Sequence, residues 1–216
     1  MSRALKDLLY EQVARVGKAL SSPKRLEILE LLAQGEKTVD ALASETATDI
    51  KLTSAHLRVL KESRLVEARR DGRFIAYRLS GDDVAALWAN LHAVATEHRV
   101  ELQVALNRVV AGPERLTEET RLSLLDKAKK GDVVRPEPEY LTAHLPHARS
   151  IPLAELKRRL AELPKGKEIV AYCRGPFCLM SNEAVALLKK RGFKARKIGD
   201  GIAEWAAAGL PTESET

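Results

Sequence analysis

Cysteine is almost absent from this chain of 216 residues, which has only two, Cys173 and Cys178, and none in its first hundred residues. Two cysteines are too few for a closed structural zinc site by themselves, because such sites normally take four ligands. Any thiol chemistry must therefore occur in the C-terminal half, and a signal from it would have to reach the N-terminal half mechanically.

Long apolar runs are also missing. Residues 1–9 do not form a secretory signal, and no run of about eighteen apolar residues could cross a bilayer. The sequence has no internal repeat, no low-complexity tract and no glycine-rich phosphate loop. We therefore expect a cytoplasmic protein without a membrane partner, and its 45% hydrophobic content suffices for two cores of roughly a hundred residues each.

The first 110 residues have the spacing of amphipathic helices. Ser22 and Pro23 suit the N-cap and first position of a second helix that ends at Gly35. A short helix around 39–43 and another over 52–64, joined by a turn near 48–51, predict a helix-turn-helix pair. The apolar stripe of the first helix consists of Leu5, Leu8, Leu9, Val13, Val16 and Leu20.

Two strand-like segments, 65–70 and 73–79, follow with only Asp71 and Gly72 between them. Asp-Gly between such segments is a strong hairpin signal, and a helix-turn-helix followed by a hairpin is a winged helix. Residues 58–78 contain seven basic and three acidic residues, which concentrates positive charge where DNA would be met. A charged hairpin that is simply solvated would have the same composition.

Residues 20–79 resemble the ArsR/SmtB family of bacterial repressors, through LSSPKRLEILELLAQGEKTVDALA and TSAHLRVLKESRLVEARRDGRFIAYRLS. Arg64 stands where that family often has glycine, which affects only the local turn. His56 would equally suit a hydrogen-bonded packing residue. The resemblance implies DNA contacts from the fourth helix, by Ser54, His56, Arg58 and Lys61, and from the wing, by Arg69, Arg70 and Arg73.

Members of that family typically sense metals, but the expected ligands are incomplete here. The cysteine motif of the third helix is replaced by residues 37–40, which offer no soft thiolate. His92, His98 and Glu101 resemble fragments of a second, zinc-type site, but Asn90 stands where Asp is required and an ordinary polar helix face explains them as well. We expect no metal and no cofactor.

A long helix is predicted over 82–109. Its apolar face, together with the first helix, suggests a symmetric homodimer that would match an inverted-repeat operator, although packing within the domain would also use such a face. The face consists of Val84, Leu87, Trp88, Leu91, Val94, Leu102, Leu106 and Val109.

The segment EIVAYCRGPFCLM, residues 168–180, predicts a strand, a tight loop and a helix over about 179–191. Loop amides and the helix N-terminus could stabilise a thiolate at Cys173, with Gly175 permitting a closed cradle and Arg174 adding charge. Buried structural cysteines, a disulfide or half of a metal site remain alternatives on local grounds. A reactive Cys173 also requires that its sulfur is not sealed in an inert interior.

Residues 117–211 resemble a rhodanese domain, through EYLTAHLPHARSIP, AYCRGPFC and GFKARKIGDGIAEWAAAGLP. The resemblance implies an α/β parallel sheet in which Cys173 accepts a sulfane sulfur as a persulfide. It also implies that the rest of the cradle is formed by Arg174, Gly175, Pro176, Phe177 and Cys178, and the second thiol could convert the persulfide into a disulfide or polysulfide bridge.

Two departures from the rhodanese pattern concern the backbone. Ala143 and His147 replace glycines of the family's Gly-His-x-Pro-Gly-Ala turn, so this turn is expected to be less tight. The run of β-branched residues before Val134 and Arg135 is short, and we expect residues to be missing there, because losing an interior strand would expose much of the core.

The sequence therefore predicts two domains, a mainly α winged helix-turn-helix domain at 1–111 and an α/β rhodanese-like domain at 117–216, with a linker at 111–115. The predicted function is a DNA-binding transcriptional regulator whose partners are an operator duplex, a second copy of the chain and a small sulfur donor. Two alternatives remain open: a sulfurtransferase tethered to DNA, which would make the protein an enzyme, and an oxidant or arsenic sensor that uses the two thiols as a pair.

Overall fold

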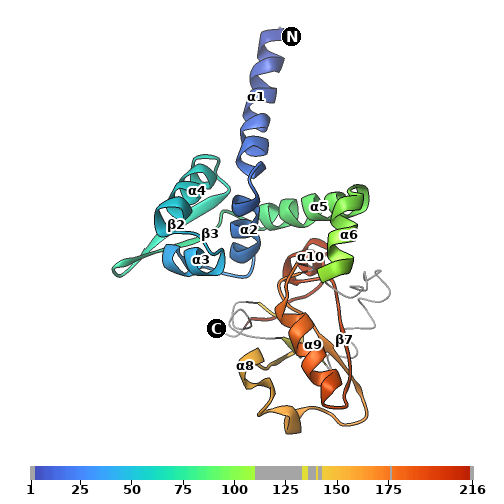
Figure 1. The fold of residues 1–216 in the computed structure, drawn as a ribbon. Helices are drawn as coiled ribbons and strands as arrows, with labels where there is room; N and C mark the ends of the chain where they lie inside the picture. The colour runs from blue at the N-terminus through green and yellow to red at the C-terminus, as the bar shows by residue number, and fades with distance from the viewer. Residues whose placement is uncertain (1–2, 110–132, 136–139, 141–142, 176, 215–216) are drawn as a thin grey trace. The chain divides into compact units, whose positions relative to one another are not determined.

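The computed structural model describes residues 3–109, 133–135, 140, 143–175 and 177–214. It divides the chain into two compact units, Met1–Trp88 and Ala89–Thr216, which are described separately below (Figure 1). The predicted linker at 111–115 and the predicted domain ends at 111 and 117 lie outside the described residues. In the parts of the chain that are described, no helix has the length and apolar character needed to cross a membrane.

The first unit is a winged helix-turn-helix, as predicted. Its helices are α1 (Arg3–Leu20), α2 (Pro23–Leu32), α3 (Val39–Glu45) and α4 (Ile50–Glu62), and its antiparallel sheet has the order β1-β3-β2. The strands are β1 (Lys37–Thr38), β2 (Val66–Asp71) and β3 (Phe74–Leu79). The register pairs Asp71 with Phe74, so the two-residue turn of the hairpin is Gly72-Arg73, one residue later than predicted. Figure 1 shows this hairpin projecting beyond the helices.

Local capping fixes the helix-turn-helix. The Thr38 hydroxyl accepts a hydrogen bond from the Ala41 amide at 3.3 Å, and the Asp49 carboxylate accepts one from the Leu52 amide at 2.9 Å. Ser22 precedes α2 in an extended conformation but makes no side-chain cap. The helices then pack through one apolar core, whose fully buried members include Ile28, Leu29, Leu42, Leu57 and Leu60.

α4 ends in a Schellman motif at a residue that is not glycine. The Arg64 amide donates to the Lys61 carbonyl at 2.9 Å and the Leu65 amide donates to the Leu60 carbonyl at 3.0 Å. Leu60 and Leu65 lie in the same buried core, which supplies the hydrophobic contact that usually accompanies this motif. Arg64 has φ +56°, a left-handed conformation that normally favours glycine, so the turn keeps a glycine-type backbone although arginine occupies the position.

The predicted single helix over 82–109 is two helices, α5 (Asp82–His98) and α6 (Val100–Val109), so that prediction is wrong at Arg99. At the interruption, the side-chain amide of Gln103 satisfies carbonyls at the end of α5, because it donates to Thr96 at 2.8 Å and to Glu97 at 3.2 Å. Val84 and Trp88 of the predicted dimer face are buried, whereas Leu87 and Val94 are exposed.

The second unit contains a four-stranded parallel sheet in the order β5-β4-β6-β7. Its strands are β4 (Val133–Arg135), β5 (Arg149–Ser150), β6 (Glu168–Ala171) and β7 (Lys194–Lys197). The connections contain α8 (Leu153–Leu156), the 3₁₀ helix η1 (Leu160–Glu162) and α9 (Met180–Lys190), and α10 (Ile202–Ala207) follows β7.

β6 is apolar on both faces, as expected of a covered parallel strand. Ile169 and Ala171 belong to one core cluster, with Leu188 of α9, whereas Val170 belongs to the other, with Trp205 of α10. Because successive side chains of a strand point to opposite faces of the sheet, the four residues of β6 contribute to the core on each face.

The short strand before Arg135 is present rather than interrupted. β4 is only three residues long, yet it pairs with β5 on one side and β6 on the other, and the sequence is continuous through it. The prediction that residues are missing near Val133–Arg135 is therefore wrong, because an interior position in this sheet can be occupied by a strand of that length.

Candidate functional site

α4 presents three of the predicted DNA contacts on one side of the helix. Ser54, Arg58 and Lys61 are spaced by four and three residues and all are exposed. Arg58 forms an ion pair with Glu62 at 3.8 Å, with both side chains largely solvated. Lys51, in the first turn of α4, is also exposed and lies three residues before Ser54.

His56 occupies a different side of α4, because residues two apart on a helix point about 200° apart. It is only partly exposed. Partial burial, followed by the positive charges of Arg25 and Lys24, lowers the pKa of His56 below its usual value. A lowered pKa favours a neutral imidazole, which is compatible with the packing role that the sequence left open.

The wing carries its three predicted arginines as exposed side chains, but they differ in what they contact. Arg69 forms an ion pair with Glu36 at 2.7 Å, Arg70 donates to the Gly72 carbonyl at 3.2 Å, and the Arg73 guanidinium lies 5.5 Å from the centre of the Phe74 ring. The exposed tip therefore keeps its charges available to a polyanion, while Arg69 must exchange Glu36 for any phosphate it binds.

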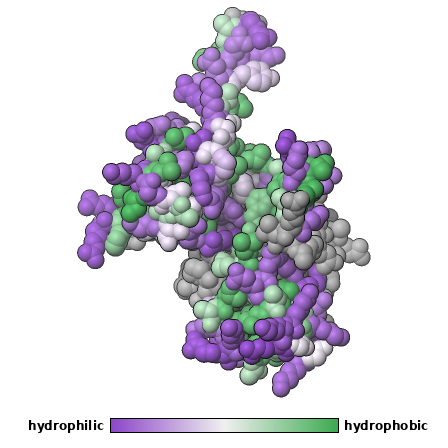
Figure 2. Space-filling view, viewed as in Figure 1, coloured by the Kyte–Doolittle hydropathy of each residue, from purple (hydrophilic) through white to green (hydrophobic). Residues whose placement is uncertain are grey.

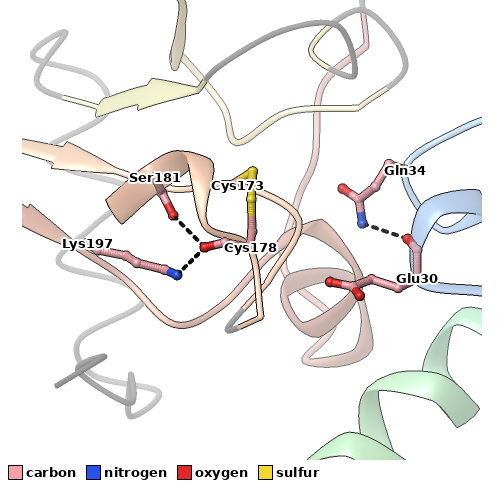
Figure 3. The surroundings of a disulfide bond; sticks show 6 residues. All are labelled: Glu30, Gln34, Cys173, Cys178, Ser181 and Lys197. Carbon is pink, nitrogen blue, oxygen red and sulfur yellow. Dashed lines mark hydrogen bonds between the residues drawn. A yellow bond between two sulfur atoms is a disulfide. The ribbon is translucent and has the colours of Figure 1, made fainter. Parts of the chain in front are cut away.

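In the second unit, the chain leaves β6 at Ala171 and enters the cysteine loop, which we define as Cys173–Cys178. The structure joins Cys173 and Cys178 in a disulfide, with their Cα atoms 6.2 Å apart (Figure 3). Cys173 is 1% exposed and Cys178 7% exposed. The Cys173 sulfur is therefore enclosed, but its neighbour is a second sulfur rather than inert hydrocarbon.

The cysteine loop is closed against α10 by two glycines. Gly175 is buried with φ +147°, outside the range of ordinary L-residues, and a Cβ there would come within 3.4 Å of the Glu204 carboxylate. Gly201 lies directly against the loop backbone, because a Cβ at Gly201 would collide with the Arg174 carbonyl. Glu204 accepts a hydrogen bond from the Gly201 amide at 2.9 Å, which fixes this approach.

Other polar groups hold the end of the cysteine loop. The Cys178 carbonyl accepts hydrogen bonds from the buried Lys197 ammonium at 2.7 Å and from the Ser181 hydroxyl at 3.5 Å (Figure 3). The Cys178 amide donates to the Gly175 carbonyl at 3.2 Å, so this amide closes the turn instead of pointing to sulfur. The first turn of α9 begins two residues later, at Met180, close to the position that the sequence predicted.

The structure describes the other residues of the predicted cradle except Pro176. Arg174 and Phe177 are half-buried, and Pro176 lies outside the described residues. Within the second unit, the Phe177 ring meets the His92 ring of α5 edge-to-face, with centroids 4.6 Å apart. Sequence reasoning missed Gly201, Glu204 and Lys197; Gly201 and Glu204 follow β7, and no local signal associates them with a loop more than twenty residues earlier.

The turn over residues 145–148 has a proline at its second position and a histidine at its third. The Ala148 amide donates to the Leu145 carbonyl at 3.0 Å and His147 has φ +61°, which is the type II arrangement. His147 thus adopts a glycine-like conformation where the rhodanese pattern has glycine, so the turn keeps its form despite the substitution. The buried His144 stacks on Tyr140 with ring centroids 3.9 Å apart.

Among the described residues, no group of three or more His, Cys, Asp or Glu side chains is placed to hold a metal ion. His98 and Glu101 are both exposed, at the end of α5 and the start of α6, while His92 contacts Phe177 and Thr96.

Residues 22–68 match the family model for bacterial regulatory proteins of the arsR family, and residues 121–208 match that for rhodanese-like domains. The chain is 46% identical over 212 residues to the HTH-type transcriptional regulator Rv0324 of Mycobacterium tuberculosis, with 96% of this chain and 93% of that protein covered. The chain belongs to the arsR family of HTH-type transcriptional regulators and has a rhodanese-like domain. It is a DNA-binding transcriptional regulator.

Two further similarities of this arsR-family regulator each cover less than half of the chain. It is 34% identical over 91 residues to a transcriptional repressor SmtB homolog of Synechocystis, covering 42% of this chain and 66% of that protein. The solution structure of a homodimeric winged helix-turn-helix DNA-binding domain from Mycobacterium bovis is 50% identical, with a TM-score of 0.44, and covers 47% of this chain and 93% of that one.

Proposed function

We propose that this regulator carries sulfane sulfur on Cys173 and that the resulting disulfide with Cys178 changes its binding to operator DNA. The observation that supports the proposal is the pairing of the two cysteines in one loop, with Cα atoms 6.2 Å apart. A persulfide on either residue would have the other thiol within reach.

The chemistry needs two displacements. The Cys173 thiolate attacks the sulfane sulfur of a polysulfide or persulfide donor, the S–S bond of the donor breaks, and the rest of the donor leaves as a thiolate. The Cys178 thiolate then attacks the Cys173 sulfur of the new persulfide and expels the outer sulfur as hydrosulfide. The donor is the oxidant, the two thiols are oxidised to a disulfide, and a cellular thiol would restore the reduced form.

The burial of Cys173 restricts the first displacement, in which its thiolate attacks the sulfur donor. Cys173 is 1% exposed in the closed loop, so the reduced loop must open before a donor reaches the sulfur. Phe177 lies between the two cysteines and contacts His92, so opening or closing the loop would change a contact with α5. α5 starts at Asp82, immediately after the wing, and is the covalent connection through which a change in the loop would reach the first unit.

We also propose that the protein forms a homodimer and that residues of α4 and the wing contact the operator. α1 exposes Leu5, Leu8, Leu9, Tyr10 and Val13 by 47–69% along one apolar stripe, which a second copy of the chain would cover. The operator contacts are Ser54, Arg58, Lys61 and Lys51 of α4 and Arg69, Arg70 and Arg73 of the wing, and a twofold dimer would present them to an inverted repeat.

A thiol-pair oxidant sensor is the second candidate, because the same disulfide would form from peroxide without any persulfide. A sulfurtransferase is disfavoured by the same geometry, since a second thiol beside Cys173 consumes the persulfide before it can be passed to an acceptor. Mass spectrometry separates these candidates. With polysulfide, the Cys178→Ser variant should gain one sulfur atom on Cys173, and the native protein should end as the disulfide.

The effect of polysulfide on DNA binding is measured by a mobility-shift titration with genomic operator fragments. Polysulfide should change the affinity of the native protein and leave that of Cys173→Ser unchanged. An equal response from Cys173→Ser removes the cysteine from the mechanism, and a response to peroxide but none to polysulfide assigns the oxidant-sensing role instead.

A further inference from the structure

The second unit has a cavity of about 350 Å³ at the end of the sheet opposite to the cysteine loop. It lies between the turn that precedes β6 and the turn that precedes β7, which are neighbours because β6 and β7 are parallel with Glu168 opposite Lys194. Both turns are at the amino ends of these strands, whereas the cysteine loop follows the carboxyl end of β6. The lining residues are Lys165, Gly166, Lys167, Arg191, Gly192, Phe193 and Lys194.

Glycines keep this cavity open. Gly166 has φ +81° and Gly192 has φ +82°, so each allows a tight turn, and neither puts a side chain into the space. Four of the remaining five lining residues are cations, and all four are exposed. We call the cavity lined by these four cations the basic cavity; the cations are Lys165, Lys167, Arg191 and Lys194.

The charge around the basic cavity is one-sided. Residues 155–197 contain twelve basic and four acidic residues, a balance of +8, which exceeds the balance of +4 in residues 58–78 around α4 and the wing. Lys189 and Lys190 extend the positive surface along the last turn of α9. In Figure 2, hydrophilic atoms dominate the lower edge of the second unit.

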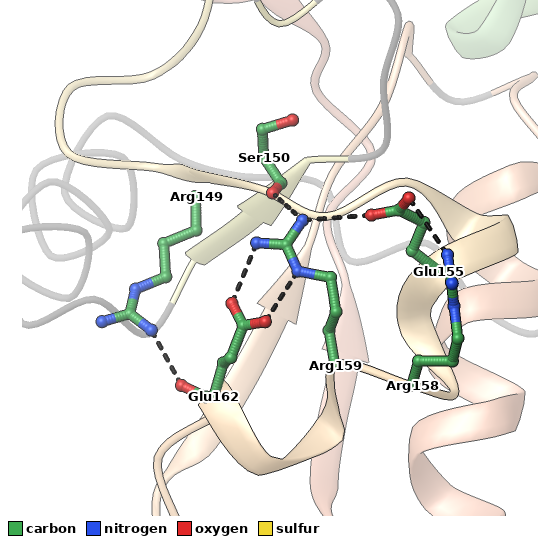
Figure 4. A network of polar contacts seen from close by, with 6 residues as sticks. All are labelled: Arg149, Ser150, Glu155, Arg158, Arg159 and Glu162. Atoms are coloured by element: carbon green, nitrogen blue, oxygen red, sulfur yellow. Dashed lines mark hydrogen bonds and ion pairs between the residues drawn. The ribbon is translucent and has the colours of Figure 1, made fainter.

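Three of the four acidic residues of this segment form ion pairs with arginines. Glu155 and Glu162 accept hydrogen bonds from Arg158 and Arg159, with Arg159 Nε 2.8 Å from a Glu162 oxygen (Figure 4). Glu168 pairs with Arg196 at 3.1 Å. Glu183 is in the first turn of α9, at the opposite end of that helix from Arg191.

By contrast, the structure shows no ion pair for Lys165, Arg191 or Lys194 among the residues it describes. Cations gathered around one concave surface repel each other, and the repulsion is relieved when an anion binds between them. The charges extend beyond the cavity to Lys189 and Lys190, over an area wider than one small anion, which suits a ligand that carries a row of phosphates.

We propose that the basic cavity is a second DNA contact, which binds phosphate oxygens of the duplex backbone outside the segment held by the winged helix. DNA is the polyanion that this regulator binds, and the covalent connection between the units holds the second contact at high effective concentration once the first is made. Lysine and arginine at such a site supply affinity by counterion release and read no sequence. The contact does not depend on sulfur chemistry.

The experiment measures binding of the full-length reduced protein to short and long mixed-sequence DNA duplexes at several salt concentrations. The test variant is Lys165→Gln/Lys194→Gln. The matched control is Arg99→Gln/Lys157→Gln, which removes the same charge from exposed positions of the same unit outside the cavity. Circular dichroism melting of each variant establishes that it is folded.

On the long duplex, the test variant should lower the slope of log K against log salt by about two relative to the native protein, since each phosphate contact contributes about 0.9. The control should retain the native slope, and lengthening the duplex should increase affinity for the native protein and the control only. Cys173→Ser should behave as the native protein, which separates this proposal from the sulfur mechanism.

Equal slopes for the native protein and the test variant would overturn the proposal, as would an equal loss in the control. Inorganic phosphate provides the remaining arm: if it shifts the amide signals of Gly166 and Gly192 in NMR spectra while the DNA slope is unchanged in the test variant, the cavity is a small-anion site and the DNA contact is refuted.

Discussion

The Arg64→Gly substitution tests whether the end of α4 is as strained as its backbone indicates. Arg64 has φ +56° and is held there by the hydrogen bonds of the Schellman motif and by the burial of Leu60 and Leu65 on either side of it. An L-residue in this conformation costs about 1–2 kcal/mol relative to its preferred conformations, whereas glycine adopts it without strain.

The expected gain is smaller than the strain, because glycine also makes the unfolded chain more flexible, by about 0.5–1 kcal/mol. The net stabilisation of Arg64→Gly should therefore be about 0.5–1 kcal/mol. For a unit of 88 residues, this corresponds to a rise in Tm of about 2–8 °C. Loss of the exposed guanidinium should contribute little to stability.

Differential scanning calorimetry of the full chain would measure this change in the transition of the first unit. Arg64→Ala is the matched control, because it removes the same charge but keeps a Cβ in the left-handed conformation, and it should leave Tm nearly unchanged. A Tm for Arg64→Gly equal to or below that of Arg64→Ala would refute the assignment of strain to this position.

Three further predictions follow from single positions. His147→Gly should raise the stability of the second unit by about 0.5–1 kcal/mol, because φ +61° is unfavourable for histidine; His147→Ala, measured by the same calorimetry, should not. Gly201→Ala should destabilise that unit by about 1–3 kcal/mol and slow disulfide formation in a thiol-trapping assay, because its Cβ meets the loop backbone; Gly17→Ala, with open space around its Cβ, should not. Because burial lowers the pKa of His56, the folded protein binds fewer protons at this site than the unfolded chain, so stability should be complete above about pH 6.5 and fall as the pH drops through the lowered pKa. His56→Gln should weaken that dependence in denaturation curves, and a pKa at or above the ordinary value in NMR titration would contradict it.

Much of the first unit was predictable because its signals are local. Helical periodicity, the Asp71-Gly72 signal and the position of Pro23 lie within a few residues of the structure they specify. The predicted helices before the wing and the hairpin are confirmed, with the hairpin turn one residue later than predicted. The predicted helix over 82–109 failed at Arg99, where the Gln103 side chain reaches back to carbonyls six and seven residues earlier, a contact that periodicity does not register.

The sequence predicted the candidate sites only in part, because some of their residues come from distant segments of the chain. The cysteine loop is contiguous in sequence, so its chemistry was visible, but the groups that support it, Gly201 and Lys197, come from β7 and the segment after it. Similarly, the basic cavity combines two turns that are unremarkable as sequence and become one surface only when β6 and β7 pair in parallel.

The sequence by itself determined the winged helix-turn-helix, the charge near α4 and the wing, and the position of the only two cysteines, since each follows from neighbouring residues. Tertiary structure alone decided that a three-residue strand can occupy the interior of the sheet, that His56 is partly buried, and that distant glycines close the cysteine loop. The physical reason is that these features depend on backbone segments brought into contact by burial of the cores, and contact between distant segments is not encoded in any one stretch of the chain.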